Sequence, residues 1–129
     1  MTFLQPFSPY LLSALRIVSG LVFLQHGTTK YLSIPATQMS GISPTTMPGA
    51  AGVVELVCGA LIVVGLFSRP AAFLASGTMA VAYFMAHAPQ NFYPILNGGE
   101  LAIMYCFAFL YIAAAGPGPL SVDRILGKA

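Results

Sequence analysis

The sequence is poor in charged residues. Of its 129 residues, five are Lys or Arg and three are Asp or Glu, which is 6% of the chain and gives a net charge of +2. An ordinary soluble domain carries about 25% charged residues. Eight charges cannot provide the charged surface that a water-soluble globule needs, and they leave no basic patch for nucleic acid. The composition therefore excludes a soluble domain, a nucleic-acid binder and a disordered tail.

Cysteine is also scarce, and the familiar catalytic motifs are missing. The two cysteines, Cys58 and Cys106, form no Cys-x-x-Cys motif, which excludes a disulfide framework. Both lie near the middle of apolar segments, so a redox pair is the alternative to two inert buried thiols. The chain has no Glu-x-x-His pair, no Gly-rich phosphate loop and no nucleophile elbow. We therefore expect no metal site, and catalysis only with a bound cofactor or partner.

Apolar residues are abundant instead. Hydrophobic residues make up 57% of the chain, and the mean hydropathy is +0.84. A helical membrane crossing needs about 20 mostly apolar residues, so this length allows four crossings with short connections. Apolar segments occur at about 10–31, 48–67, 70–87 and 98–115. The sequence predicts an all-α fold: one domain over residues 1–129 that forms an integral membrane four-helix transmembrane bundle.

Local signals mark where these segments begin and end. Pro48 and Pro70 suit the first turn of a helix, and Asn97 is a plausible N-cap for the fourth segment. Residues 116–119, Gly-Pro-Gly-Pro, stop that helix. Residues 1–9 are apolar and lack Lys or Arg, so we expect a retained first crossing with an interfacial cap rather than a signal peptide.

Charge predicts the orientation of the four crossings. Both termini then lie on one side of the membrane, with a net charge of +3 from Arg16, Arg69, Asp123, Arg124 and Lys128. The other side has a net charge of −1 from Lys30, Glu55 and Glu100. Because Lys and Arg favour the cytoplasmic side, we expect both termini in the cytoplasm, in a bacterial inner membrane.

Ionisable residues inside the apolar segments converge on the outer third of the membrane. These are His26, Lys30, Glu55, His87 and Glu100, and they come from all four segments. Such groups are costly in lipid and tend to mark function. A carboxylate beside a histidine exchanges protons near neutral pH, and Tyr83 or Tyr105 can hydrogen-bond the carboxylate. We expect a ligand-binding pocket suited to an amphipathic molecule such as a quinone. The alternative is that the two glutamates only neutralise Lys30 and hold the helices together.

Four pieces of the sequence, in order, resemble the DoxX family of small membrane proteins. The first is Leu15-Arg16 with Gly20, Phe23–Gly27 and Lys30. The others are Gly52–Gly59, Gly65–Arg69 and Gly116–Asp123. The resemblance implies a four-span protein of the kind often found as a subunit of a quinol oxidase or a thiosulfate:quinone oxidoreductase. It highlights Arg16, His26, Gly27, Lys30, Glu55, Arg69 and Asp123. Of these, Arg16, Arg69 and Asp123 are interpreted as structural or lipid-anchoring residues.

These observations favour one function over two others. The favoured function is a redox-associated accessory subunit with a quinone or quinol pocket near the outer face. It predicts a cavity near His26 and Glu55. The alternative is a non-catalytic structural or assembly subunit, with other membrane subunits or a second copy as its partner. A channel or carrier is least favoured, because Arg16 is the only ionisable residue in the inner half of any segment.

Overall fold

The structure is a computed structural model that describes all 129 residues, and it contains helices and no strands. Its body consists of α1 (Ser8–Leu32), α2 (Met47–Val64), α3 (Ser68–Ala82) with the π-helical turn η2 (Tyr83–His87), and α5 (Glu100–Ala115). Three short elements complete it: the 3-10 helix η1 (Thr2–Phe7), α4 (Pro94–Asn97) and α6 (Val122–Ile125). The predicted all-α class is confirmed.

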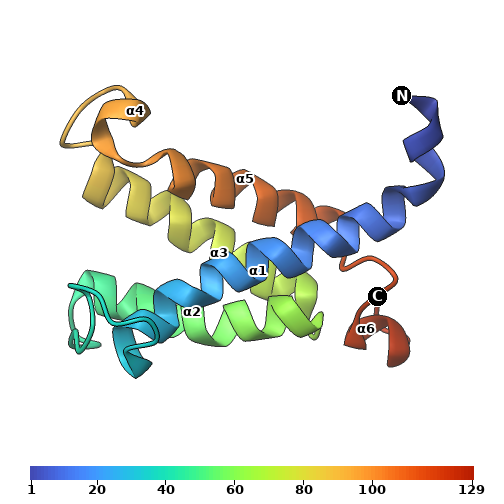
Figure 1. Cartoon of the computed structure of the whole chain (residues 1–129), viewed down its shortest axis with the longest axis horizontal. Coiled ribbons are helices and arrows are strands. Elements are labelled where there is room, and N and C mark those ends of the chain that lie inside the picture. Colours follow the sequence, from blue (N-terminus) through green and yellow to red (C-terminus); the bar gives the residue numbers. More distant parts are fainter.

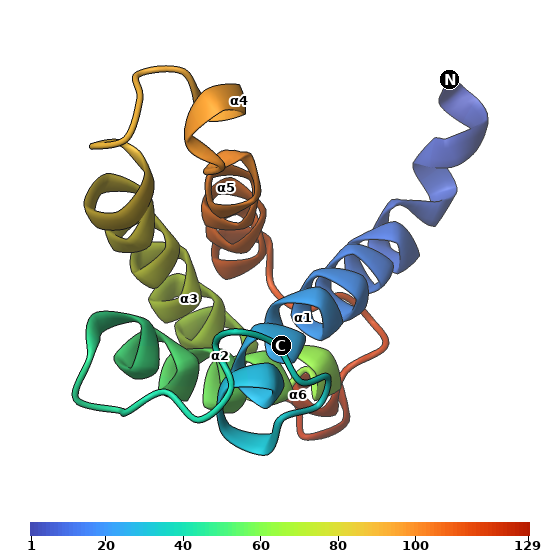
Figure 2. The same ribbon diagram turned by 60° about the vertical axis from the view of Figure 1, so that its left-hand side comes forward.

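The four main helices are arranged as two pairs. α1 packs mainly against α2, and α3 packs mainly against α5, while α2 also contacts α3. All four run roughly along the long axis of the molecule, and both termini lie toward the same end of it (Figure 1). Seen from the side, α1 diverges from α5 toward its N-terminus, and η1 projects away from the other helices (Figure 2). The bundle is therefore splayed rather than closed.

Glycines allow α1 and α2 to approach closely. A Cβ atom added at Gly27 would lie 2.7 Å from the backbone nitrogen of Leu56, and one added at Gly59 would lie 2.9 Å from the Cα atom of Leu24. Real Cβ atoms essentially never come this close to backbone atoms. The crossing therefore depends on small residues, which is the usual way in which helices associate in lipid.

Aromatic side chains fill the centre of the bundle. Phe23 from α1 is fully buried and meets Phe109 of α5 edge to face, with ring centroids 5.0 Å apart. Tyr105 stacks parallel to Phe109 at 5.5 Å. Large apolar side chains also cover the outside of the bundle, among them Val57, Phe73, Phe84, Met104 and Phe107. An apolar interior and an apolar exterior together suit a helix bundle surrounded by lipid.

Two helices are long and apolar enough to cross a membrane. They are Thr2–Leu32, in which η1 continues into α1, and Met47–Val64. Glu100–Ala115 is a shorter apolar helix. Within residues 1–9, expected to be a cap before the first crossing, Thr2–Phe7 form the 3-10 helix η1, and Ser8 and Pro9 open α1. η1 directly precedes α1 in the chain but bends away from its axis (Figure 1).

Two helix ends differ from the sequence-based expectation. α2 ends at Val64, because Gly65 adopts a left-handed conformation with φ of 75°, and Phe67 stands before α3 instead of closing α2. Asn97 is not the N-cap of the fourth helix. It ends the separate turn α4, and its side-chain oxygen accepts a hydrogen bond from the Gly99 N–H at 2.8 Å, so α5 begins only at Glu100.

Candidate functional site

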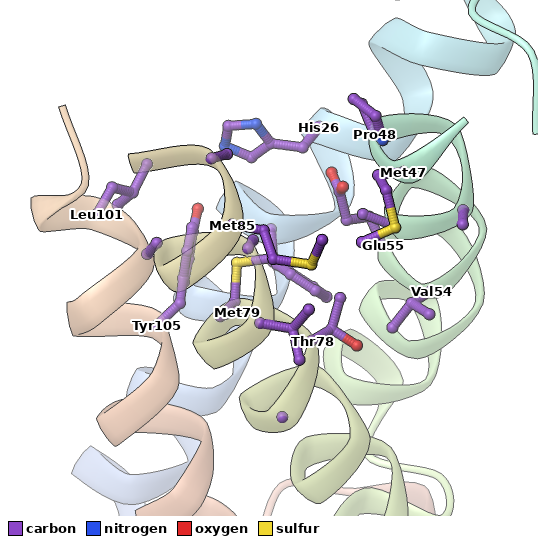
Figure 3. A pocket seen from close by; sticks show the side chains of 18 of the residues that line it. His26, Met47, Pro48, Val54, Glu55, Thr78, Met79, Met85, Leu101 and Tyr105 are labelled. Carbon is purple, nitrogen blue, oxygen red and sulfur yellow. The ribbon is translucent and has the colours of Figure 1, made fainter. Parts of the chain in front are cut away.

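A cavity of about 840 Å³ lies between α1, α2, α3 with η2, and α5, at the end of the bundle opposite the termini. We call it the outer cavity, after the side of the membrane on which the charge pattern predicts it. Its walls are largely apolar, and four of the six methionines of the chain contribute to them: Met39, Met47, Met79 and Met85. The cavity that the sequence predicts near His26 and Glu55 is present, since both residues line it (Figure 3).

Lys30 and Glu55 form an ion pair at the edge of the outer cavity. The Lys30 Nζ atom lies 2.6 Å from the Glu55 Oε1 atom, and both side chains are almost completely buried. Gly52, one turn before Glu55, makes room for the pair, since a Cβ atom there would lie 2.9 Å from the Cδ atom of Lys30. The predicted attraction between Lys30 and a glutamate is thus present, with Glu55 as the partner.

Three buried polar atoms in the outer cavity have no hydrogen-bond partner within the protein. They are the Oε2 oxygen of Glu55, the Nε2 ring nitrogen of His26 and the hydroxyl oxygen of Tyr105. The side chains come from α2, α1 and α5, and all three residues line the outer cavity (Figure 3). A buried polar group without a partner costs about 1–3 kcal/mol, so such groups are rare outside functional sites. Together they form a hydrogen-bonding end in an apolar cavity.

His87 also lines the outer cavity, but its ring is fixed by the protein. Its Nδ1 atom lies 2.9 Å from the carbonyl oxygen of Asn97. Because a carbonyl only accepts hydrogen bonds, Nδ1 is the donor, and Nε2 of the neutral ring is left as an acceptor. The imidazole also stacks on Tyr83, with centroids 6.4 Å apart. His87 therefore joins η2 to α4 in addition to facing the cavity.

Glu100 does not join the cluster, contrary to the sequence-based prediction. It is the first residue of α5, its side chain is exposed, and it neither lines the outer cavity nor forms an ion pair. Leu101, Ala102 and Tyr105 face the cavity from α5 instead. Depth in the membrane predicted Glu100, but the rotational register of α5 turns it outward. The spacing of 101, 102 and 105 is one helix face and was the available signal for Tyr105.

Arg16 serves the structure at the end of the bundle where both termini lie. It is fully buried, and its guanidinium donates hydrogen bonds to the carbonyl oxygens of Ile62, at 3.3 Å, and of Leu120. Ser13, one turn earlier, accepts from the Leu120 N–H at 3.1 Å and donates to the Pro117 carbonyl at 3.2 Å. Complete burial among carbonyls supports the structural interpretation of Arg16 and leaves it no contact with lipid phosphate.

Arg69 and Asp123 satisfy helix ends on the same side. The Arg69 Nη1 atom donates to the carbonyl oxygens of Ala113, at 3.1 Å, and of Ala114, which close α5. The Asp123 carboxylate accepts from the N–H groups of Phe67, at 2.8 Å, and Ser68, at 2.9 Å, which open α3. These backbone groups have no partner within their own helices, so the two charged side chains act as caps. A lipid-anchoring role for Arg69 stays a prediction.

Cys58 and Cys106 are free thiols. Cys58 is buried in the core cluster, and the Cys106 sulfur lies 3.6 Å from the Ser76 hydroxyl. No group of three His, Cys, Asp or Glu side chains is close enough to hold a metal ion together. The chemistry that the outer cavity offers is therefore hydrogen bonding and proton exchange by imidazole, carboxylate and phenol.

Two known proteins are similar to this chain over most of its length. A Haemophilus influenzae protein described as uncharacterized is 42% identical over 126 residues, which cover 94% of this chain and 94% of that protein. A Mycobacterium tuberculosis protein described as an uncharacterized membrane protein is 27% identical over 130 residues, which cover 88% of this chain and 80% of that protein. No solved structure matches the chain.

The sequence also matches the profile of the DoxX family over residues 11–88. This range includes His26, Lys30, Glu55 and His87 of the outer cavity, together with Arg16 and Arg69 at the opposite end of the bundle. It stops before α4 and α5, so Tyr105 and the Gly116–Asp123 piece lie outside it. The matched range is more than half of the chain, and the chain belongs to the DoxX family.

Proposed function

We propose that the chain is an integral membrane protein with four crossings, formed by α1, α2, α3 with η2, and α5. Twenty residues of α3 and η2 at about 1.5 Å per residue give about 30 Å, the thickness of the hydrocarbon core. The apolar exterior of the bundle supports this arrangement, as does the similarity to a mycobacterial protein described as a membrane protein. Both termini face the cytoplasm, and the outer cavity lies in the opposite half of the membrane.

We further propose that the outer cavity binds the head group of a quinone or quinol. The observation that carries this proposal is the trio of unpartnered buried atoms on Glu55, His26 and Tyr105 at the end of an apolar cavity. A quinone-type ring carries two oxygens on an apolar body with an apolar tail. A cavity of about 840 Å³ lies within the usual range for small-molecule sites. The chain then serves as a redox-associated accessory subunit that holds the ligand for a partner enzyme.

The test is binding to the purified protein in mild detergent. Decylubiquinone is added in its oxidised and in its reduced form, and native quinone that co-purifies is extracted and quantified. We expect saturable binding to the wild type. Glu55→Gln should weaken binding of the reduced form at least tenfold, because a hydrogen bond to a charged group is worth about 1.5–3 kcal/mol. Glu100→Gln is the matched control, since Glu100 lies outside the cavity. A wild type that binds neither form contradicts the proposal.

The alternative, a non-catalytic assembly subunit, is supported by a different observation. The Lys30–Glu55 pair is closed within the chain, and η1 with the first turns of α1 projects from the bundle, where a partner subunit can cover it (Figure 2). Native mass spectrometry of the tagged protein from its own membrane separates the two functions. A stable partner chain with no bound small molecule supports the assembly role, whereas bound quinone supports the ligand-holding role.

A further inference from the structure

The unpartnered groups of the outer cavity differ in the hydrogen bonds that they can make. The Glu55 Oε2 atom belongs to a carboxylate whose other oxygen lies 2.6 Å from the Lys30 amine. The carboxylate of this ion pair only accepts hydrogen bonds. The Tyr105 hydroxyl donates one and accepts others, and the His26 Nε2 atom does either according to its tautomer. The cavity thus presents one obligatory acceptor beside two adaptable groups.

Two other lining side chains add to this set, since the His87 Nε2 atom is a further acceptor in the neutral ring and Lys30 brings additional donors. The Thr78 hydroxyl donates to the Leu74 carbonyl oxygen at 2.8 Å, and His87 Nδ1 donates to the Asn97 carbonyl. The Lys30 amine donates to Glu55 Oε1 and has two further N–H groups. Glu55 itself is 2% exposed, so bulk water does not serve its free oxygen. A ligand that satisfies the cavity must therefore bring a hydrogen-bond donor to Glu55 Oε2.

We propose, building on the quinone site proposed above, that the outer cavity selects the reduced ligand. One hydroxyl of a quinol donates a hydrogen bond to the Glu55 Oε2 atom, and the other hydroxyl pairs with the Tyr105 hydroxyl or the His26 imidazole. A quinone has two carbonyl oxygens that only accept. It can accept hydrogen bonds from Tyr105, His26 and Lys30, but it leaves the carboxylate oxygen unpaired and facing a lone pair. The cavity thus distinguishes quinol from quinone by whether Glu55 Oε2 receives a hydrogen bond, and not by the shape of the ligand.

The expected preference is large enough to measure. One hydrogen bond to a charged acceptor corresponds to a quinol affinity about ten- to hundredfold above the quinone affinity. Tighter binding of the reduced form also makes reduction of the bound ligand more favourable. The midpoint potential of the bound two-electron couple should therefore rise by about 30 mV for each tenfold preference. This shift gives a second readout on the wild type alone.

The experiment is an anaerobic titration of the detergent-solubilised full chain with decylubiquinol and, separately, with decylubiquinone. The wild type should bind the quinol at least tenfold more tightly, and Glu100→Gln should keep that ratio. Glu55→Gln should bring the ratio close to one, because its amide both donates and accepts. Equal affinities in the wild type overturn the selectivity and leave the quinone site intact. Binding of neither form overturns both proposals.

A second variant guards against loss of folding. Glu55→Gln leaves the buried Lys30 amine without its partner, which destabilises the protein. The double variant Lys30→Met/Glu55→Gln removes both charges and keeps similar volumes, so it should fold and should also lose the preference for quinol. If the double variant folds and still binds the quinol at least tenfold more tightly, a group other than Glu55 makes the selection and the proposal is wrong.

Discussion

Tyr105 retains a hydroxyl where a phenyl ring would pack as well. The ring stacks on Phe109 and meets Phe23 edge to face, but the buried hydroxyl has no partner in the protein. Tyr105→Phe should therefore raise the free energy of unfolding by about 1 kcal/mol while weakening decylubiquinol binding about tenfold. Thermal unfolding and a binding titration, both in detergent, measure the two effects. A loss of stability would show that the hydroxyl is already satisfied and would remove it from the site.

The Lys30–Glu55 pair should show strong coupling between its two charges. Removing one partner of a buried ion pair strands the other and costs about 3–5 kcal/mol, whereas replacing both is nearly neutral. We expect Lys30→Met and Glu55→Gln each to lower the unfolding midpoint sharply, and the double variant to recover most of the loss. A double-mutant cycle on thermal stability measures the coupling. Additive losses would mean that the two side chains do not interact.

At this scale, the cost of burying charge made part of the site predictable. Lys30, Glu55 and His26 stood out because ionisable groups are rare in apolar segments. The same argument failed for Glu100, since depth along a helix says nothing about the direction in which a side chain points. Tyr105 was noted only as a hydrogen-bonding neighbour, because a tyrosine in lipid needs no special explanation. Only packing shows that its hydroxyl is left without a partner.

Among the elements, the crossing of α1 and α2 is the contact most sensitive to side-chain size. A Cβ atom at Gly27 would meet the backbone nitrogen of Leu56 at 2.7 Å, whereas Gly77 in α3 has open space around it. Gly27→Ala should lower stability by about 1–3 kcal/mol through overpacking. Gly77→Ala should be neutral or stabilising by about 0.5–1 kcal/mol, because alanine favours the helix. Thermal unfolding of both variants tests this, and an equal response would contradict it.

The start of α3 should depend on pH through Asp123. Burial opposes ionisation of this carboxyl, but the N–H groups of Ser68 and Phe67 and the charge of Lys128 outweigh burial and lower its pKa. The capping contribution is therefore complete above the pKa of the unfolded chain, near 4, and is lost as the pH falls through the lower folded pKa. Asp123→Asn should cost about 1 kcal/mol at pH 7 and less at pH 3. Thermal midpoints at the two pH values measure this, and a pH-independent difference would argue against it.

The existence of the helices was easier to predict than their ends. Long apolar segments bounded by Pro and Gly give a clear signal, and the all-α class followed from it. Ends depend on single backbone conformations, such as the left-handed Gly65 and Gly98. Gly98 separates α4 from α5, which is why Asn97 caps a turn rather than the fourth main helix. Such conformations depend on tertiary packing that a periodic pattern does not contain.

For the whole molecule, the charge distribution predicts a defined orientation. Both termini lie toward one end of the bundle, the end at which Arg16, Arg69 and Asp123 make their contacts (Figure 1). Fusions of green fluorescent protein and of alkaline phosphatase at each terminus report which side of a bacterial inner membrane that end occupies. We expect fluorescence and no phosphatase activity at both termini. Phosphatase activity at either terminus would place the outer cavity in the opposite half of the membrane.

The hydrogen bond between Arg16 and the Leu120 carbonyl also constrains the order of biogenesis. The guanidinium leaves the ribosome in the first helix, but one of its two acceptors belongs to a segment made more than a hundred residues later. During insertion, this charge must be held by water, lipid or the insertion machinery until the C-terminal segment folds back. The end of the bundle that contains Arg16 therefore reaches its final structure last. Ribosome-stalled chains that stop before residue 116 should be cleaved by proteases more readily than the finished protein.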